Sequence, residues 1–311
     1  MSLLSVTELE VHYATRDGIL RAVDDVSFAI EPGETVGLVG ESGCGKSTLG
    51  KTLLRLVEPI AGAMRFDGAD VGALRGQELR AFRRRATMIF QDPFGSLNPR
   101  HSIGEILTAP LAVHGVGDRR SRKRRVAEML ERVGLPNGAI SRYPHEFSGG
   151  QRQRIGIARA LILGPDLVVC DEPVSALDLS IQAQILNLLA AMKREFGLAY
   201  LFISHDLSVV NYFCDRVLVM YLGRIVESAP NATLWSNPRH PYTRALIEAV
   251  PDATRRRHVA PIGGDIPSAR DLPKGCRFHP RCPLATEICR EQEPVLREIE
   301  PGREAACHHA G

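Results

Sequence analysis

The chain has 311 residues, of which 44% are hydrophobic and 24% are charged, and its formal net charge is +3. This length allows one large core and a smaller appended domain. The net charge is too small to indicate nucleic-acid binding by itself. No apolar run approaches the roughly 20 residues of a membrane-spanning helix, and the N-terminus lacks the positive region of a signal peptide. We therefore expect a cytoplasmic protein that reaches a membrane only through partners.

The first 30 residues alternate between apolar and polar side chains, which predicts antiparallel strands. The apolar positions are Val6, Leu9, Val11, Val26, Phe28 and Ile30. A short apolar run, Thr35–Val39, predicts a buried strand, and residues 48–56 predict a helix. Between them lies the sequence G-E-S-G-C-G-K-S-T, residues 40–48. Strand, glycine-rich turn and helix are the setting of a phosphate-binding loop.

This loop carries the groups that hold a nucleoside triphosphate. Its glycines let backbone N–H groups surround a polyphosphate, and the helix dipole favours negative charge at the same place. Lys46 can reach the β- and γ-phosphates, and the Ser47 hydroxyl can ligate Mg²⁺. We expect nucleotide contacts from the loop residues Gly40, Ser42, Gly43, Cys44, Gly45, Lys46, Ser47 and Thr48.

Strands and helices alternate further along the chain, which predicts a parallel sheet covered by helices. Short strands are expected at residues 88–90, 167–170 and 199–204, and an amphipathic helix at residues 180–196. Residues from about 93 to 163 are mainly helical in pattern. This insertion is too long for a simple crossover, so it should form a helical subdomain.

The ends of the predicted strands carry the second half of an ATPase site. Asp171 can hold Mg²⁺ through water, and Glu172 is placed to polarise the attacking water. Gln91 offers a neutral amide to the Mg²⁺ shell or to the water. His205, just after the strand at 199–204, can donate to the γ-phosphate; alone it would be an ordinary histidine at a strand end.

A second phosphate-binding helix start is predicted at Ser148-Gly149-Gly150, which open a helix over residues 151–163. One site does not need two such N-termini. The arrangement that uses both is a head-to-tail dimer, in which this segment closes on the nucleotide of the other chain.

Two basic runs, Arg80–Arg85 and Arg119–Arg125, allow two interpretations. They could bind an anionic partner, either nucleic acid or lipid headgroups. They could also be solvated helix faces, which we favour because no aromatic residues interleave them and Glu128 and Glu131 follow the second run at helical spacing.

The character of the sequence changes after about residue 228. Prolines become frequent there, and the hydrophobic periodicity weakens apart from a helix expected near residues 242–250. We expect a small appended domain over residues 229–311. Four cysteines crowd it at Cys276, Cys282, Cys289 and Cys307. They could hold a [4Fe–4S] cluster or Zn²⁺, or remain reduced or disulfide-paired. Structural zinc sites usually contain closely spaced pairs, which are missing here, although His279, His308 and His309 could serve zinc.

Taken in order, these motifs resemble the nucleotide-binding subunits of ABC transporters over about residues 4–228. The resemblance implies an α/β P-loop NTPase cassette: a mostly parallel sheet, an antiparallel β subdomain and a helical subdomain. It also implies that Tyr13 stacks on adenine, a role for which the alternative is a surface strand tyrosine. Ser148, Gly149, Gly150 and Gln151 would form the signature segment, and Asp178 would end the Ser175–Asp178 loop.

The segments at residues 41–50, 89–99, 142–151 and 240–243 resemble the dipeptide/oligopeptide importer subfamily, and Pro144–Phe147 resembles its F-type subunit. The resemblance implies ATP-driven peptide import by a peripheral protein on the cytoplasmic face of the bacterial inner membrane, and a [4Fe–4S] cluster rather than zinc in the tail. The implied partners are a D-type ATPase (a homodimer being the alternative), two transmembrane permease subunits and a periplasmic or lipid-anchored binding protein, with no nucleic acid.

Three other functions remain open from the sequence. The same motor serves importers of nickel, sugars or opines. A soluble ABC ATPase acting on nucleic acid or ribosomes usually carries two cassettes or a long coiled coil, and neither is present here. The third is a metal-binding regulator in which ATP hydrolysis is secondary, and a measured basal ATPase rate would distinguish it from an ATP-driven transporter subunit.

Overall fold

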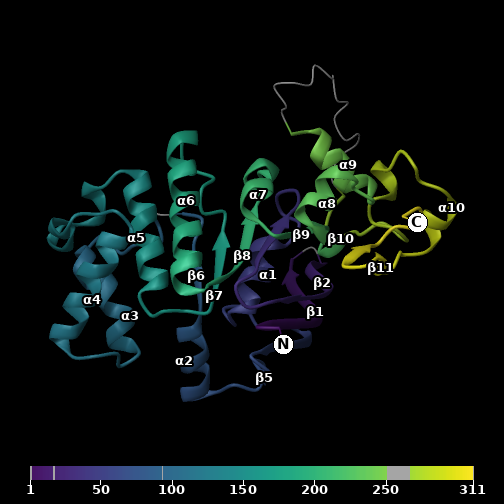
Figure 1. Ribbon diagram of the computed structural model, residues 1–311. Helices are drawn as coiled ribbons and strands as arrows, with labels where there is room; N and C mark the ends of the chain where they lie inside the picture. The colour runs from purple at the N-terminus through teal and green to yellow at the C-terminus, as the bar shows by residue number, and fades with distance from the viewer. Residues whose placement is uncertain (1, 17, 93, 251–266, 311) are drawn as a thin grey trace. The chain divides into compact units, whose positions relative to one another are not determined.

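The computed structural model describes residues 2–16, 18–92, 94–250 and 267–310 (Figure 1). The chain forms two compact units. Unit 1 consists of Met1–Leu3, Glu31–Glu34 and Ala69–Leu201, and unit 2 consists of Leu4–Ile30, Thr35–Gly68 and Phe202–Gly311. This division does not coincide with the expected boundary near residue 228, which remains a prediction.

Unit 2 contains the antiparallel strands that the alternating pattern predicted. Strand β1 (Leu4–Thr15) pairs with β2 (Gly18–Ile30) on one side and β4 (Ala61–Phe66) on the other. Val6, Leu9 and Val11 of β1 are buried. The change from an even to an odd position accompanies the irregularity in the register between Val6 and Leu9. The expected antiparallel β subdomain is therefore confirmed.

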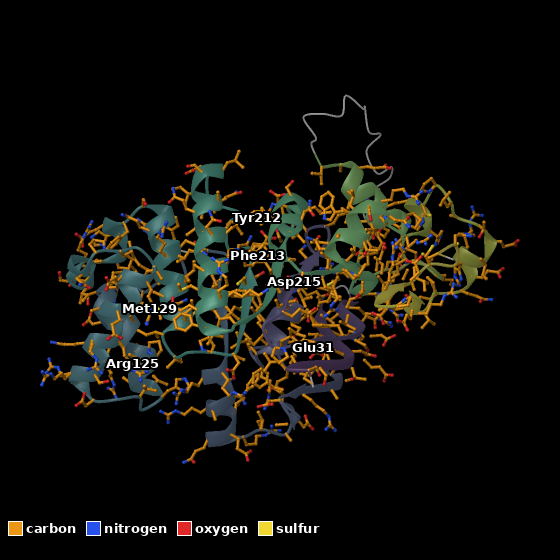
Figure 2. All side chains as sticks on the ribbon, viewed as in Figure 1. Glu31, Arg125, Met129, Tyr212, Phe213 and Asp215 are labelled. Atoms are coloured by element: carbon orange, nitrogen blue, oxygen red, sulfur yellow. The ribbon has the colours of Figure 1, made fainter. Side chains whose placement is uncertain are left out.

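A second set of strands in unit 2 carries the glycine-rich loop. Strand β3 (Thr35–Val39) is buried along its whole length and pairs in parallel with β9 (Arg216–Tyr221). Asp215, just after α7 (Leu207–Phe213), accepts a bond from the Thr35 N–H at 2.8 Å, and Phe213 packs on Phe202 with 4.9 Å between ring centroids (Figure 2). The bond from Thr35 to Asp215 fixes the start of β3, and with it the position of the loop that follows.

The C-terminal region belongs to the same compact unit. Strand β10 (Arg224–Pro230) pairs antiparallel with β9 and with β12 (Arg303–Ala305), and β11 (Arg297–Glu300) pairs with β12. The remaining elements are α8 (Asn231–Ser236), α9 (Pro241–Glu248), η3 (His279–Arg281) and α10 (Glu287–Glu291). The tail thus extends the sheet by two strands.

Buried ion pairs attach the tail to the rest of unit 2. Arg277 donates to Asp24, to the Leu222 carbonyl at 2.5 Å and to Glu293 at 2.9 Å. Arg303 and Glu227, which are 1% and 0% exposed, pair at 3.2 Å. Because a buried charge is costly without its partner, these pairs require the tail to keep one fixed place on the strands.

Unit 1 contains the expected helices. Strand β6 (Ala86–Ile89) pairs in parallel with β7 (Leu167–Asp171). Between these strands the chain forms α3 (Ile103–Val113), α4 (Arg119–Arg132), η1 (Asn137–Ser141), η2 (Pro144–Glu146) and α5 (Gly149–Leu161). Local capping fixes where they begin, for example through the reciprocal bonds of Ser102 and Glu105 at the start of α3.

Several helix and strand ends differ from those expected. The phosphate-loop helix, α1, runs from Lys46 to Leu53 rather than over 48–56, because Arg55 has a left-handed backbone with φ of 50°. The strand expected at 88–90 is β6, which begins at Ala86. The helix expected at 180–196 is α6 (Leu179–Phe196), capped by Asp178. Strand β8 (Ala199–Ser204) has the expected bounds.

Both basic runs lie on helices. Arg80, Arg83 and Arg84 are exposed on α2 (Gly76–Arg85). On α4, Arg125 is exposed whereas Met129 is buried (Figure 2), and Arg124 pairs with Glu128 at 3.6 Å. The geometry agrees with solvated helix faces. Within the residues described, none of the helices has the length and apolar character needed to cross a membrane.

Candidate nucleotide site

The glycine-rich loop requires glycine at both of its bends. Gly40 has a φ of 153°, and a Cβ there would lie 2.1 Å from the Met220 carbonyl oxygen. Gly45 has a φ of 109°, and its Cβ would lie 1.9 Å from the Ala22 carbonyl oxygen. Any side chain would collide with backbone at these two positions. The loop therefore needs glycine at these two positions to keep its tight curve between β3 and α1.

Lys46 is held inside the curve of the loop. Its ammonium group donates to the carbonyl oxygens of Gly40 at 2.7 Å and Glu41 at 2.9 Å, and the residue is 5% exposed. Cys44 lies beside it, and burial raises the pKa of this thiol. The loop thus places one cation among backbone groups, with Ser42 and Gly43 exposed at its tip. These residues fit the triphosphate and Mg²⁺ expected from the sequence.

Gln91 and Glu172 meet at the ends of two neighbouring strands in unit 1. The Gln91 Nε2 donates to the Glu172 Oε2 at 2.9 Å. Asp171 is the buried last residue of β7, and Glu172 follows it with a left-handed φ of 46°. Such strain in a residue other than glycine is typical of functional sites. The bend turns the Glu172 carboxylate toward the glutamine at the end of β6.

The signature segment begins α5 and faces solvent. The Ser148 Oγ accepts from the Gln151 N–H at 3.4 Å, and the Gln151 Oε1 accepts from the Ser148 N–H at 3.1 Å. A Cβ on Gly150 would lie 2.6 Å from Ile181, so glycine lets α5 approach α6. The helix begins at Gly149 rather than at residue 151, because Ser148 serves as its N-cap.

Three further predicted residues lie at element ends or edges. Asp178 caps α6, where its carboxylate accepts from the Ser180 hydroxyl at 2.8 Å and the Ile181 N–H at 3.0 Å, and these bonds lower its pKa. His205 is exposed directly after β8. Tyr13 is 37% exposed on β1. His205 and Tyr13 share unit 2 with the phosphate loop, and Asp178 shares unit 1 with Glu172.

The four tail cysteines gather near one another in unit 2. Burial raises the pKa of Cys276 to about 11; the bond from the Phe278 N–H lowers it, and the charges of the other three thiols raise it. In three of the four, the sulfur accepts from the N–H two residues further on, as at Cys307, where the distance to the His309 nitrogen is 3.4 Å. At Cys276, Cys282 and Cys307 these N–H bonds favour the thiolate, whereas burial, the larger effect, favours the thiol and raises the pKa.

Among the residues described, a tight grouping of potential metal ligands occurs at Glu10, His12 and Asp24, whose ligand atoms lie within 4.8 Å of one another. Sequence reasoning did not identify it. Arg277 also binds Asp24, and its positive charge opposes a cation there. No trio drawn from the described tail thiols and histidines is this compact.

Sequence reasoning also missed the residues that hold the loop from outside. Arg281 and Tyr242 both bind Glu41, the second residue of the loop. They lie 240 and 201 positions away along the chain. Residues 240–243 had been noted for their resemblance to importers and the expected helix near residues 242–250, and the region around Arg281 only for its cysteines.

Comparison with known proteins places these motifs in a family. Residues 23–175 match the model of the ABC transporter family, and residues 226–289 match the C-terminal region of oligopeptide/dipeptide transporters. A Brucella ovis protein named for peptide import and ATP binding is 56% identical over 98% of this chain and 97% of its own length. The oligopeptide transport ATP-binding protein AppF of Bacillus subtilis is 49% identical over 99% of this chain and 97% of its own.

Solved structures agree with this assignment. The dimeric cassette MJ0796, in a post-hydrolysis state bound to ADP and Pi, has a TM-score of 0.67 and 28% identity, covering 73% of this chain and 98% of that one. CbiO1 of Clostridium perfringens, part of an ABC transporter complex, has the same TM-score and covers 76% and 91%. The fold and the loop define an ABC-type ATPase cassette. The chain belongs to the ABC transporter family, in the branch that carries the oligopeptide/dipeptide transporter C-terminal region.

Proposed function

We propose that the chain is the ATP-binding and ATP-hydrolysing subunit of a bacterial ABC importer for di- or oligopeptides. The observation that carries this proposal is the joint presence of a complete phosphate loop and the oligopeptide transporter C-terminal region. Relatives named for peptide import match nearly the whole chain. Since the chain would reach the inner membrane through its partners, co-purification with the permease subunits tests this part of the proposal.

The chain's own residues divide the work of hydrolysis. Lys46 leaves the carbonyls of Gly40 and Glu41 to bind the β- and γ-phosphates. Ser47 and Asp171 would hold Mg²⁺, which neutralises charge on the phosphates. Glu172 orients the attacking water and accepts its proton, while Gln91, already hydrogen-bonded to Glu172, keeps the carboxylate in place or joins the Mg²⁺ shell. His205 donates to the γ-phosphate.

Recognition of the nucleotide would be completed by another chain. Ser148 is exposed at the N-terminus of α5, where N–H groups favour phosphate. A head-to-tail partner would place this segment and its Asp178 loop against the opposite nucleotide, with Tyr13 stacking on adenine in its own site. The structural neighbour MJ0796 is described as dimeric. We propose a D-type ATPase as the partner, with a homodimer as the alternative outcome.

Replacing Ser148 by arginine should abolish hydrolysis at the partner's site while leaving nucleotide binding at this chain's own loop intact. The added side chain blocks the helix N-terminus and brings positive charge, yet it belongs to the segment that serves the other nucleotide. The measurement is binding and turnover in a two-ATPase pair with the substitution on one side only. Ser236→Arg, on the exposed side of α8, is the control. Loss of binding at the mutated chain's own loop would contradict the head-to-tail arrangement.

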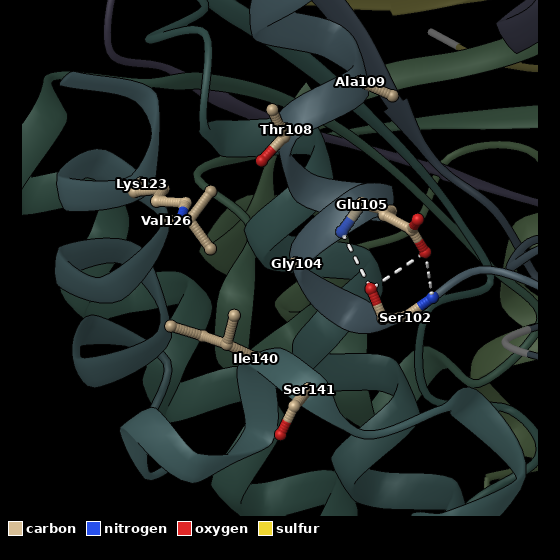
Figure 3. Close-up of a pocket in the computed structure, with 9 residues that line it drawn as sticks. All are labelled: Ser102, Gly104, Glu105, Thr108, Ala109, Lys123, Val126, Ile140 and Ser141. Carbon is tan, nitrogen blue, oxygen red and sulfur yellow. Dashed lines mark hydrogen bonds between the residues drawn. The ribbon is translucent and has the colours of Figure 1, made fainter. Parts of the chain in front are cut away.

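A pocket beside the helix that follows residues 92–99 is a candidate docking site for a permease. It has a volume of about 690 Å³ and lies between α3, α4 and η1 (Figure 3). The lining residues are Ser102, Gly104, Glu105, Thr108, Ala109, Lys123, Val126, Ile140 and Ser141. Nearby in sequence, Phe94 is 61% exposed, as an unoccupied protein-binding surface often is.

We propose a [4Fe–4S] cluster at Cys276, Cys282, Cys289 and Cys307. Four thiolates around one Zn²⁺ would lie about 3.8 Å apart, given Zn–S bonds of about 2.3 Å. The described tail thiols do not form even a trio within 4.8 Å, and a four-iron cluster separates its ligands because each thiolate binds a different iron. The N–H groups directed at the sulfurs support such a cluster. Its role would be structural, since the tail has no hydride or radical motif.

Anaerobically purified protein should be brown, with a broad absorbance near ~400 nm from thiolate-to-iron charge transfer. Cys282→Ser should remove the colour and loosen residues 267–310, while ATP binding persists. Cys214→Ala, which removes a buried thiol outside the tail, should keep the colour. Colourless wild-type protein with one zinc per chain, or with no metal, would reject the cluster.

A further inference from the structure

Residues of the C-terminal extension, the appended domain over residues 229–311, bind the phosphate loop at Glu41. Arg281 binds its carboxylate with two parallel bonds, from Nη1 to Oε2 at 2.8 Å and from Nη2 to Oε1 at 2.9 Å. The Arg281 side chain is 5% exposed and that of Glu41 is 19% exposed. A forked, largely buried guanidinium–carboxylate pair is among the stronger and more directional polar contacts in proteins.

The same residue is held a second time through its backbone. The Glu41 N–H donates to the Tyr242 hydroxyl at 2.8 Å. Tyr242 lies at the start of α9 and is fully buried against Tyr221 and Phe278, with ring centroids 4.6 Å and 5.4 Å away. Phe278 lies in the cysteine-containing segment, so the aromatic cluster packs this segment against α9, and both contact the loop through Glu41.

On its other side, Glu41 faces the catalytic lysine. The Glu41 carbonyl accepts from Lys46, as does the carbonyl of Gly40. A movement of Glu41 therefore moves both oxygens that hold the ammonium group. The bent backbone between Gly40 and Lys46 is the same backbone that must surround the phosphates.

The position of Arg281 is set by the cysteine-containing segment itself. Arg281 ends η3 and directly precedes Cys282. The His279 N–H donates to the Cys276 carbonyl at 2.9 Å, and the Cys282 N–H donates to the His279 carbonyl at 3.3 Å. The short helix is thus fastened at both ends by cysteines of the tail cluster.

We propose that Arg281 is a positioning residue for ATP binding, through which the C-terminal extension holds the phosphate loop in its binding conformation by way of Glu41. This inference rests on the proposed ATPase function and deepens it. The C-terminal extension, which the cassette MJ0796 does not contain, would then adjust the affinity of the phosphate loop for ATP. Both belong to unit 2. Loosening of the segment around Cys276 and Cys282 would then lower the affinity for ATP without abolishing its binding.

The test compares the full chain with Arg281→Gln, Arg281→Lys, Glu41→Gln and the double variant Arg281→Gln/Glu41→Gln. ATP affinity is measured by titration without turnover, and kcat and KM by steady-state hydrolysis. We expect Arg281→Gln and Glu41→Gln each to raise the Kd and KM for ATP about tenfold, as loss of a charge-assisted fork allows, with kcat within about twofold of wild type. The double variant should be no worse than either single one. Arg281→Lys, which keeps the charge without the fork, should recover part of the affinity.

Arg290→Gln, at an exposed position of the same extension, is the matched control and should leave affinity unchanged. Thermal melting separates a folding defect from a positioning defect; if Arg281→Gln does not fold, Glu41→Gln carries the test from the cassette side. Unchanged affinity in Glu41→Gln, or losses that multiply in the double variant, would overturn the proposal. Wild-type protein that neither binds nor hydrolyses ATP would instead overturn the proposed function.

Discussion

Glu172→Gln will stop ATP turnover and leave ATP binding intact. The amide cannot accept the proton of the attacking water, so the loss in turnover should be on the order of 10² or more. The fold should not change, because the glutamine side chain has the same shape and its amide oxygen can still accept from Gln91 as Glu172 does now at 2.9 Å. Bound ATP should persist and hold the two ATPase chains in a closed dimer.

The measurements are single-turnover hydrolysis, nucleotide titration and the oligomeric state in the presence of ATP. Glu128→Gln, which neutralises an exposed carboxylate on α4, is the matched control and should hydrolyse ATP normally. Turnover close to that of wild type would remove Glu172 from the role of water-orienting base.

Lys46→Ala should act at the earlier step and weaken nucleotide binding by about tenfold or more, because its charge contacts phosphate in the ground state as a charge-assisted bond. The structure adds a second reason. The ammonium group also joins the Gly40 and Glu41 carbonyls, so its removal loosens the loop. The measurement is titration with a fluorescent nucleotide.

Lys51→Ala, in the last turn of the same helix, removes an equal charge away from the loop and should bind ATP as the wild type does. The two predictions separate the roles of Lys46 and Glu172. An equal loss of ATP binding in Lys46→Ala and Glu172→Gln would contradict that assignment.

The nucleotide loop and the order of the elements follow from local sequence. Gly40 and Gly45 occupy positions where a Cβ would meet backbone oxygen at 2.1 Å and 1.9 Å, so the motif and its conformation are inseparable. Ser148 and Asp178 begin helices by capping them, which short-range rules anticipate. Helix ends differ from those expected by up to three residues, and the end of α1 depends on a single backbone conformation, that of Arg55.

The tail could not be predicted to the same depth, because its structure depends on distant partners. Strand β12 exists through its pairing with β10, where Ala305 lies opposite Glu227. Hydropathy would place Glu227 and Arg303 at the surface, yet their mutual pairing buries both. Arg281 and Glu41 are 240 positions apart, and the spacing of residues in either segment does not indicate that they pair.

Uptake of peptides into vesicles measures whether this chain couples ATP hydrolysis to peptide import. The full complex, assembled from this chain, the second ATPase, both permease subunits and the binding protein, is reconstituted with the ATPase face in contact with ATP. We expect ATP-dependent uptake of labelled di- or oligopeptides, loss of this uptake with Glu172→Gln, and no uptake of nickel, sugars or opines. ATP hydrolysis by the intact complex without peptide uptake, or with uptake of one of those other solutes instead, would contradict it.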